Sequence, residues 1–98
     1  MDNYQYQAEA QRTVPSRMTK PNRINLYLIG LLKSCGKLGG MVADLSAIEP
    51  NKLESELGDA LWYLTSIATT YDLNLDKIME KNIARLQSKY PSGCSKKK

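Results

Sequence analysis

Glu56 and Asp59 are the residues whose type and spacing most directly suggest chemistry. If this segment is helical, a spacing of three places both carboxylates on one face, roughly 5 to 6 Å apart. Carboxylate oxygens are preferred ligands of Mg²⁺, and two of them at this distance can share one ion. The competing interpretation is a solvated acidic face near the beginning of a helix, where the helix dipole favours negative side chains. The spacing alone leaves both interpretations open.

The residue types that are missing exclude several classes of site. The chain contains no histidine, which excludes histidine general bases, histidine-containing triads, and zinc or di-iron sites with histidine ligands. Its two cysteines, Cys35 in an apolar stretch and Cys94 in a polar tail, form neither a metal-ligand pair nor a disulfide framework. Any catalysis therefore has to use carboxylates, lysines or a hard metal ion.

A second group of candidate residues forms a basic stripe in the last third of the chain. Lys77, Lys81, Arg85 and Lys89 recur every four residues, which places them along one face of a helix. They can bind phosphate groups, or they can form a solvated face that suits the C-terminal end of a helix dipole. Asn82 lies at the edge of the neighbouring apolar face, where a polar side chain needs a partner. Lys81, Asn82 and Arg85 are therefore candidate substrate-binding residues.

Trp62 and Tyr63 follow the acidic pair directly and offer aromatic surfaces. An indole ring can stack on a nucleobase, which makes Trp62 a further candidate substrate-binding residue. An aromatic residue at helical spacing is more often part of a core or a dimer interface. Both roles for Trp62 stay open at the level of the sequence.

Four helices are predicted to position these residues. Apolar residues recur at alternating steps of four and three in residues 23–45, 51–71 and 75–90, which is typical of amphipathic helices. A shorter helix is expected in the first dozen residues. No segment alternates with a period of two, so strands are not predicted.

The expected helix ends follow from capping residues and from proline. Asp2 or Asn3 is expected to cap the short helix, and Asn22 and Asn74 are expected to cap the first and third long helices. Pro50 disfavours the helical conformation of the residue before it, so it is expected to separate the first long helix from the second. These ends make consecutive helices antiparallel neighbours.

We predict an all-α fold, an antiparallel helical bundle of three long helices plus a short N-terminal helix. One domain is expected to span residues 1–92, followed by a disordered basic tail at residues 93–98. The first two long helices are apolar over more than a narrow stripe, and a chain of 98 residues cannot easily cover both sides of them. The bundle is therefore predicted to be completed by oligomerisation, as a homodimer or a dimer-based oligomer.

The formal net charge of +4 is distributed unevenly. Residues 13–40 carry five basic and no acidic side chains, residues 41–80 carry eight acidic and two basic ones, and residues 81–98 carry six basic ones. This pattern allows internal salt bridges as readily as polyanion binding, so a nucleic-acid partner is not favoured. No run approaches the roughly 20 apolar residues that span a bilayer, and no secretory signal follows Met1. A cytoplasmic location without a membrane partner is the default expectation.

The segment around the acidic pair resembles a known family. It reads Glu56-Leu57-Gly58-Asp59-Ala60-Leu61-Trp62-Tyr63-Leu64 and is similar to the second metal motif of the MazG-like nucleotide pyrophosphohydrolases, within the all-α nucleoside triphosphate pyrophosphatase superfamily. Three further segments resemble the family in the same order. Its opening segment is similar to Tyr4-Gln5 with Ala8 and Arg12-Thr13, and its third helix to Leu73-Asn74-Leu75 with Glu80-Lys81-Asn82-Ile83 and Leu86. Its closing motif is similar to Lys89-Tyr90-Pro91-Ser92-Gly93.

This resemblance implies an all-α, dimer-based enzyme that uses Mg²⁺ or Mn²⁺. Such an enzyme splits a nucleoside triphosphate into a monophosphate and pyrophosphate. Glu56 and Asp59 would then be metal ligands and catalytic residues. Lys81 and Asn82, with Arg85 downstream, are implied to lie near the substrate.

The chain departs from the family at the first metal motif, a Glu-x-x-Glu pair on the preceding helix. The two corresponding positions are Ser34 and Lys37. Four carboxylates would give the site a charge of −4, whereas Ser34, Lys37, Glu56 and Asp59 together carry −1. Lys37 is therefore expected to take the place of the cation and to pair with the two acids. Pyrophosphohydrolase activity is expected to be weak or absent, and the alternative is a non-catalytic nucleotide-binding or partner-binding relic of the same fold.

Overall fold

The computed structural model describes residues 1–15 and 17–93, except for the side chains of residues 44–46. Every regular element in this part of the chain is helical, namely α1 (Asn3–Gln11), α2 (Lys20–Met41), the 3₁₀ segment η1 (Val42–Ala47), α3 (Pro50–Thr70) and α4 (Leu75–Lys89). The prediction of an all-α fold with one short and three long helices is confirmed. The predicted disordered tail, residues 93–98, lies outside the described residues except for Gly93.

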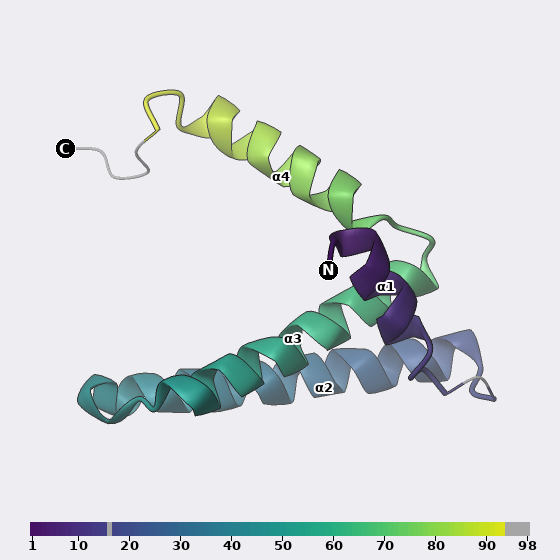
Figure 1. The fold of residues 1–98 in the computed structure, drawn as a ribbon, viewed down its shortest axis with the longest axis horizontal. Coiled ribbons are helices and arrows are strands. Elements are labelled where there is room, and N and C mark those ends of the chain that lie inside the picture. Colours follow the sequence, from purple (N-terminus) through teal and green to yellow (C-terminus); the bar gives the residue numbers. More distant parts are fainter. Residues whose placement is uncertain (16, 94–98) are drawn as a thin grey trace.

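Helices α2 and α3 form an antiparallel hairpin that contains most of the buried residues (Figure 1). Tyr27 is fully buried, and its ring packs edge-on against Trp62, with the ring centroids 5.6 Å apart. Gly30 lies so close to the ring of Tyr63 that a Cβ atom at this position would overlap it. The two helices therefore approach closely at Gly30, and aromatic rings fill the space beside this contact.

Helix α2 begins and ends at other residues than the sequence suggested. Thr19 rather than Asn22 is its N-cap, because Thr19 Oγ1 accepts a hydrogen bond from the Asn22 N–H at 3.3 Å. Pro21 lies in the first turn, where the missing N–H would have no helical partner. At the other end the α-helix stops at Met41 and tightens into η1. The α-helix therefore begins three residues before the predicted Arg23 and ends four residues before the predicted Leu45.

Helices α1 and α4 begin after predicted capping residues, whereas the cap of α3, Glu49, was not predicted. Asp2 caps α1 through a reciprocal capping box, and Asn74 caps α4. Glu49 is extended before Pro50, as expected, and its carboxylate accepts the N–H of Asn51 at 2.9 Å. With Thr19 of α2, a local bond from a side chain to the backbone is thus present at all four helix starts.

Helix α1 lies across the connection between α3 and α4. Gln7 Nε2 donates to Thr69 Oγ1 and to the carbonyl of Leu73, both at 3.0 Å. Gln7 Oε1 accepts the N–H of Leu75 at 3.1 Å, and Asn3 adds a side-chain contact to α4. One amide side chain thus joins the end of α3, the turn and the start of α4.

Helix α4 packs against α1 and rises away from the hairpin (Figure 1). The expectation that consecutive helices are antiparallel neighbours therefore holds for α2 and α3 but not for α3 and α4. Asp72 adopts the left-handed conformation, with φ of 57°, and the Leu73 N–H bonds back to the Ala68 carbonyl at 2.8 Å. This Schellman-type ending closes α3. The contacts of α1 then hold α4 in its diverging direction.

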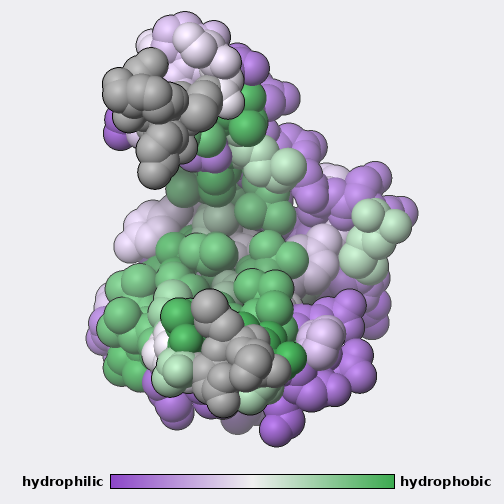
Figure 2. Space-filling model, turned by 90° about the vertical axis from the view of Figure 1, so that its left-hand side faces the viewer, coloured by the Kyte–Doolittle hydropathy of each residue, from purple (hydrophilic) through white to green (hydrophobic). Residues whose placement is uncertain are grey.

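Large apolar side chains remain exposed on all three long helices. They include Leu28, Ile29 and Leu32 on α2, Leu57, Leu61 and Leu64 on α3, and Ile78, Met79, Ile83 and Leu86 on α4, and we call this set the open apolar face. Figure 2 shows hydrophobic surface that extends from α4 down onto the hairpin. None of the described helices combines the length and apolar character needed to cross a bilayer. Completion of the bundle by a second copy stays a prediction.

Candidate nucleotide site

The predicted site residues of α2 and α3 meet across the hairpin. Lys37 Nζ lies 3.8 Å from Glu56 Oε2. The Lys37 side chain is 63% exposed and the Glu56 side chain 18% exposed, so the lysine reaches over the acid from the solvent side. Because one partner is largely hydrated, this ion pair contributes at most about 1 kcal/mol to stability.

The other two positions of the site differ in their exposure. Ser34 is buried in the hairpin, and Asp59 is exposed on α3. Glu56 Oε1 is buried, and no described residue hydrogen-bonds to it. The pairing expected from the sequence is therefore present for Glu56, whereas Asp59 stands one turn further along in solvent.

This donor set does not suit Mg²⁺. The ion requires near-octahedral oxygen ligands, chiefly carboxylates and water. Here the Lys37 ammonium contacts one oxygen of Glu56, and Ser34 offers only a neutral hydroxyl. Among the side chains that the structure describes, no group of three or more acids or cysteines is placed to hold a metal ion. The residues present therefore do not fit the metal that the family resemblance implies.

Trp62 is engaged by neighbouring parts of the chain. Its Nε1–H donates to Thr13 Oγ1 at 2.8 Å, and Thr13 in turn donates to the Ala10 carbonyl at 2.7 Å. Its ring packs edge-on against Tyr27 and Tyr63, with ring centroids 5.6 Å and 5.3 Å away. Trp62 thus anchors the segment after α1 to α3. Its contact with a nucleobase stays a prediction.

The remaining predicted residues, Lys81, Asn82 and Arg85, are exposed on α4. Lys81 and Arg85 line a surface cavity of about 300 Å³ together with Lys77, and we call it the α4 basic cavity. Arg and Lys side chains that converge on one cavity are suited to binding phosphate oxygens. The structure therefore brings two of the predicted substrate-binding residues to a common surface.

One chain does not bring this cavity and the Lys37–Glu56 pair together. Glu56 lies in the first half of α3, whereas α4 begins beyond the opposite end of α3 and packs against α1 (Figure 1). A site that combines both groups needs a second copy of the chain.

A polar cluster that was not predicted from the sequence lies near the C-terminal end of α3. Thr65 and Ser66 are buried, and their hydroxyl groups have no hydrogen-bond partner among the described residues. The hydroxyl of Tyr27 is likewise buried and unpaired, and burial raises the pKa of this phenol while nearby Arg23 partly lowers it. The available signal was the group of hydroxyl residues beside the apolar seam of the second long helix, at positions 65, 66, 69 and 70.

Comparison with known proteins adds one partial relationship. No known family model and no solved structure matches the chain. A stretch of 41 residues is 37% identical to the "Gene 37 protein" of Mycobacterium phage L5. The stretch covers 42% of this chain and 36% of the phage protein, whose name states no activity. The similarity is thus partial in both proteins.

Proposed function

We propose that this protein is a MazG-like helical protein that binds nucleoside triphosphates without hydrolysing them, because an ion pair has replaced its metal site. The observation that carries the proposal is the 3.8 Å contact between Lys37 Nζ and Glu56 Oε2. It puts a positive side chain where the resemblance implies a divalent ion.

A lysine supplies charge but not the chemistry of a metal ion. A divalent ion polarises a phosphoryl oxygen and lowers the pKa of a bound water, which then attacks phosphorus. An ammonium group has three N–H donors, but it cannot coordinate a phosphoryl oxygen or a water molecule as a metal ion does. Glu56 and Asp59 would therefore have no metal-activated water to act on. The chain also has no histidine that could activate a water molecule as a general base.

The α4 basic cavity is the proposed phosphate-binding surface. Lys77, Lys81 and Arg85 contribute three positive charges around it. The salt bridges among described residues use other cations, Arg12 with Glu9 and Lys37 with Glu56. The cavity can therefore accept phosphate oxygens without first breaking one of these ion pairs.

A homodimer is the proposed assembly. The open apolar face lies on both the hairpin and α4, and a second copy would cover it. In the arrangement that we propose, α4 of one copy packs on the hairpin of the other, which puts the α4 basic cavity beside that hairpin. This arrangement would supply the combined site that a single chain lacks.

Calorimetric titration with a panel of nucleoside triphosphates in EDTA tests the binding proposal. Binding is expected to persist without a divalent ion and to weaken at least about tenfold in the double variant Lys81→Gln/Arg85→Gln, because two charge-assisted contacts are lost. Lys52→Gln, at an exposed position of α3, is the matched control and should bind normally. Binding that is absent in EDTA and appears with Mg²⁺ would contradict the proposal.

Pyrophosphate release from the same panel, with Mg²⁺ or Mn²⁺ titrated from zero, tests the absence of catalysis. No turnover is expected from the folded protein. Metal-dependent turnover would contradict the proposal and would favour the competing one, a working nucleoside triphosphate pyrophosphohydrolase, which the similarity of residues 56–64 to the family supports.

A gain-of-function variant tests the placement of the site. The double change Ser34→Glu/Lys37→Glu is expected to create Mn²⁺ binding, measured by electron paramagnetic resonance, because it surrounds Glu56 and Asp59 with further carboxylates. Lys33→Glu adds an acid at an exposed position of the same helix and should bind no ion. If the double variant also binds none, Ser34 and Lys37 do not share a site with the two acids.

A further inference from the structure

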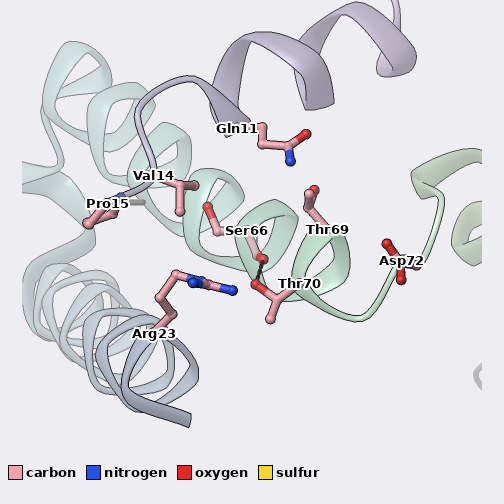
Figure 3. A pocket seen from close by; sticks show the side chains of 8 residues that line it. All are labelled: Gln11, Val14, Pro15, Arg23, Ser66, Thr69, Thr70 and Asp72. Carbon is pink, nitrogen blue, oxygen red and sulfur yellow. Dashed lines mark hydrogen bonds between the residues drawn. The ribbon is translucent and has the colours of Figure 1, made fainter. Parts of the chain in front are cut away.

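A pocket lies at the opposite end of the hairpin from Lys37 and Glu56. Its volume is about 360 Å³. The segment after α1 forms one wall, the first turn of α2 another, and the last turns of α3 the floor (Figure 3). The lining residues are Gln11, Val14, Pro15, Arg23, Ser66, Thr69, Thr70 and Asp72. The pocket shares no residue with either surface described above, and Ser66 is about 15 Å along α3 from Glu56.

Two opposite charges line this pocket. Arg23 is half-buried on one side, and Asp72 lies on the other side, at the turn after α3 (Figure 3). One guanidinium nitrogen of Arg23, Nη1, donates to the Met18 carbonyl at 2.6 Å, which holds the side chain in place. A guanidinium group has five N–H donors, so most of them stay available. A ligand with an anionic end and a hydrogen-bond donor end would satisfy both charges.

Ser66 is the group in the pocket that most directly indicates a ligand. It is 2% exposed, and its Oγ has no hydrogen-bond partner among the described residues. The hydroxyl points from the floor toward the Val14 side of the pocket (Figure 3). Neighbouring hydroxyls are already used, because Thr69 Oγ1 accepts from Gln7 and Thr70 donates to the Ser66 carbonyl at 2.8 Å. Buried hydroxyl groups normally have a partner, and a ligand hydroxyl would supply it.

We propose that this pocket binds a small organic anion that carries hydroxyl groups. Its phosphate or carboxylate would lie against the Arg23 guanidinium, which binds planar or tetrahedral oxyanions through paired N–H donors. Its hydroxyl groups would bond to Ser66 and donate to the Asp72 carboxylate. A volume of about 360 Å³ is at the small end of metabolite pockets, so the ligand has the size of a sugar phosphate or a sugar acid.

Binding of four defined probes tests this proposal by calorimetry in EDTA. The probes are ribose 5-phosphate, gluconate, uncharged ribose and inorganic phosphate. Ribose 5-phosphate or gluconate is expected to bind at least about tenfold more tightly than ribose or inorganic phosphate, because only these two offer an oxyanion together with hydroxyls. Preference for one of them identifies the anionic group as phosphate or carboxylate. Equal binding of all four, or no binding, would overturn the proposal.

Variants locate the binding with matched controls. Arg23→Gln is expected to weaken binding of the preferred probe at least about tenfold, whereas Arg17→Gln, in the connection before α2 and outside the lining, should leave it unchanged. Ser66→Ala is expected to weaken it severalfold without lowering the melting temperature, because the hydroxyl it removes has no hydrogen-bond partner among the described residues. Ser55→Ala, at an exposed position of the same helix, controls for serine removal.

Two outcomes would place the ligand elsewhere. If Arg17→Gln weakened binding as much as Arg23→Gln, the attraction would be a general charge effect and the proposal would fail. It would equally fail if Lys81→Gln/Arg85→Gln abolished binding of ribose 5-phosphate, because the α4 basic cavity would then be its site. Normal binding in that α4 variant is expected, whatever the result with nucleoside triphosphates.

Discussion

At the scale of single residues, Lys37 changes what its neighbours can do. Its ammonium lies 3.8 Å from Glu56 Oε2 and neutralises an acid that would otherwise be suited to a cation. Ser34 is too short and uncharged to replace a carboxylate ligand. In the core of the hairpin, Tyr27 is fully buried, and its hydroxyl has no hydrogen-bond partner among the described residues.

Tyr27 makes stability depend on alkaline pH. Burial raises its pKa above the ordinary value of 10.0, so the folded protein holds the phenolic proton more tightly than the unfolded chain. This contribution to the free energy of unfolding is fully present below pH 10 and is lost as pH rises through the folded-state pKa. Urea unfolding between pH 7 and 11 should show a smaller alkaline decline for Tyr27→Phe than for the wild type.

The same variant provides its own control at neutral pH. Because the Tyr27 hydroxyl has no described partner, its removal should change the free energy of unfolding by no more than about 1 kcal/mol. Lysines titrate in both proteins, so their effect cancels when the free energies of unfolding of wild type and Tyr27→Phe are subtracted. Parallel alkaline curves for wild type and Tyr27→Phe would contradict the assignment of this pH dependence.

At the scale of elements, two features determine how the helices are placed. A glycine lets α2 and α3 approach closely, and the polar side chains of α1 hold the turn before α4. The first contact lies within the hairpin, and the second joins the hairpin to α4. The close contact at Gly30 and the hydrogen bonds of Gln7 can each be removed by one substitution, with little direct effect on the other feature.

Gly30→Ala is expected to destabilise the hairpin. Alanine would gain up to about 1 kcal/mol in helix propensity, but its Cβ would overlap the Tyr63 ring, and overpacking of this kind costs about 1–3 kcal/mol. Gly36→Ala has open space around the added carbon and should raise the free energy of unfolding by up to about 1 kcal/mol. Urea unfolding compares the two. Equal stabilisation by both would show that α2 and α3 do not touch at Gly30.

Gln7→Ala is expected to loosen α4 from the rest of the chain. It removes three hydrogen bonds to Thr69, Leu73 and Leu75, with a cost of about 1–3 kcal/mol. Hydrogen exchange of the Leu75 amide should then become faster, because its acceptor is lost. Gln87→Ala, at an exposed position of α4, should leave this exchange rate unchanged. Unaltered exchange in Gln7→Ala would mean that α4 is held by other contacts.

At the scale of the whole molecule, the open apolar face is the dominant feature. The described part of the chain buries only three apolar side chains well, those of Ala10, Tyr27 and Ala68. Many more are exposed, and on the face shown in Figure 2 they lie on both α4 and the hairpin. Exposed apolar surface of this extent is typical of an interaction surface, and in the proposed dimer a second copy covers it.

Sedimentation equilibrium is expected to show a mass of at least twice 11.0 kDa. Leu61→Glu and Ile83→Glu each place a charge within the open apolar face, on α3 and α4, and should shift the protein toward the monomer because buried charge opposes association. Ser55→Glu adds the same charge at an exposed, polar position of α3 and should not. A monomeric wild type at micromolar concentration would contradict the proposed dimer.

Local sequence patterns determined the helices themselves. The three-four spacing of apolar residues predicted all three long helices, and short-range capping by Asp2 and Asn74 predicted two of the helix starts. Both effects act over one or two turns, so they are visible in the residues alone. The start of α2 was missed because Thr19 and Asn22 are both good caps, and only the hydrogen bond at 3.3 Å distinguishes them.

Tertiary structure decided what the helices bring together. The sequence suggested that Lys37 and Glu56 share a site, and the packing of α2 on α3 put them in contact. It could not show that α4 leaves the hairpin, because this depends on the turn at Asp72 and on Gln7, which is more than 60 positions away from its partners. The pocket at Arg23 and Ser66 was equally hidden, because residues 11–23 form it together with residues 66–72, which follow more than 40 positions later. Periodicity reports which face of a helix is apolar, whereas the partner of that face is set by long-range contacts that no local pattern contains.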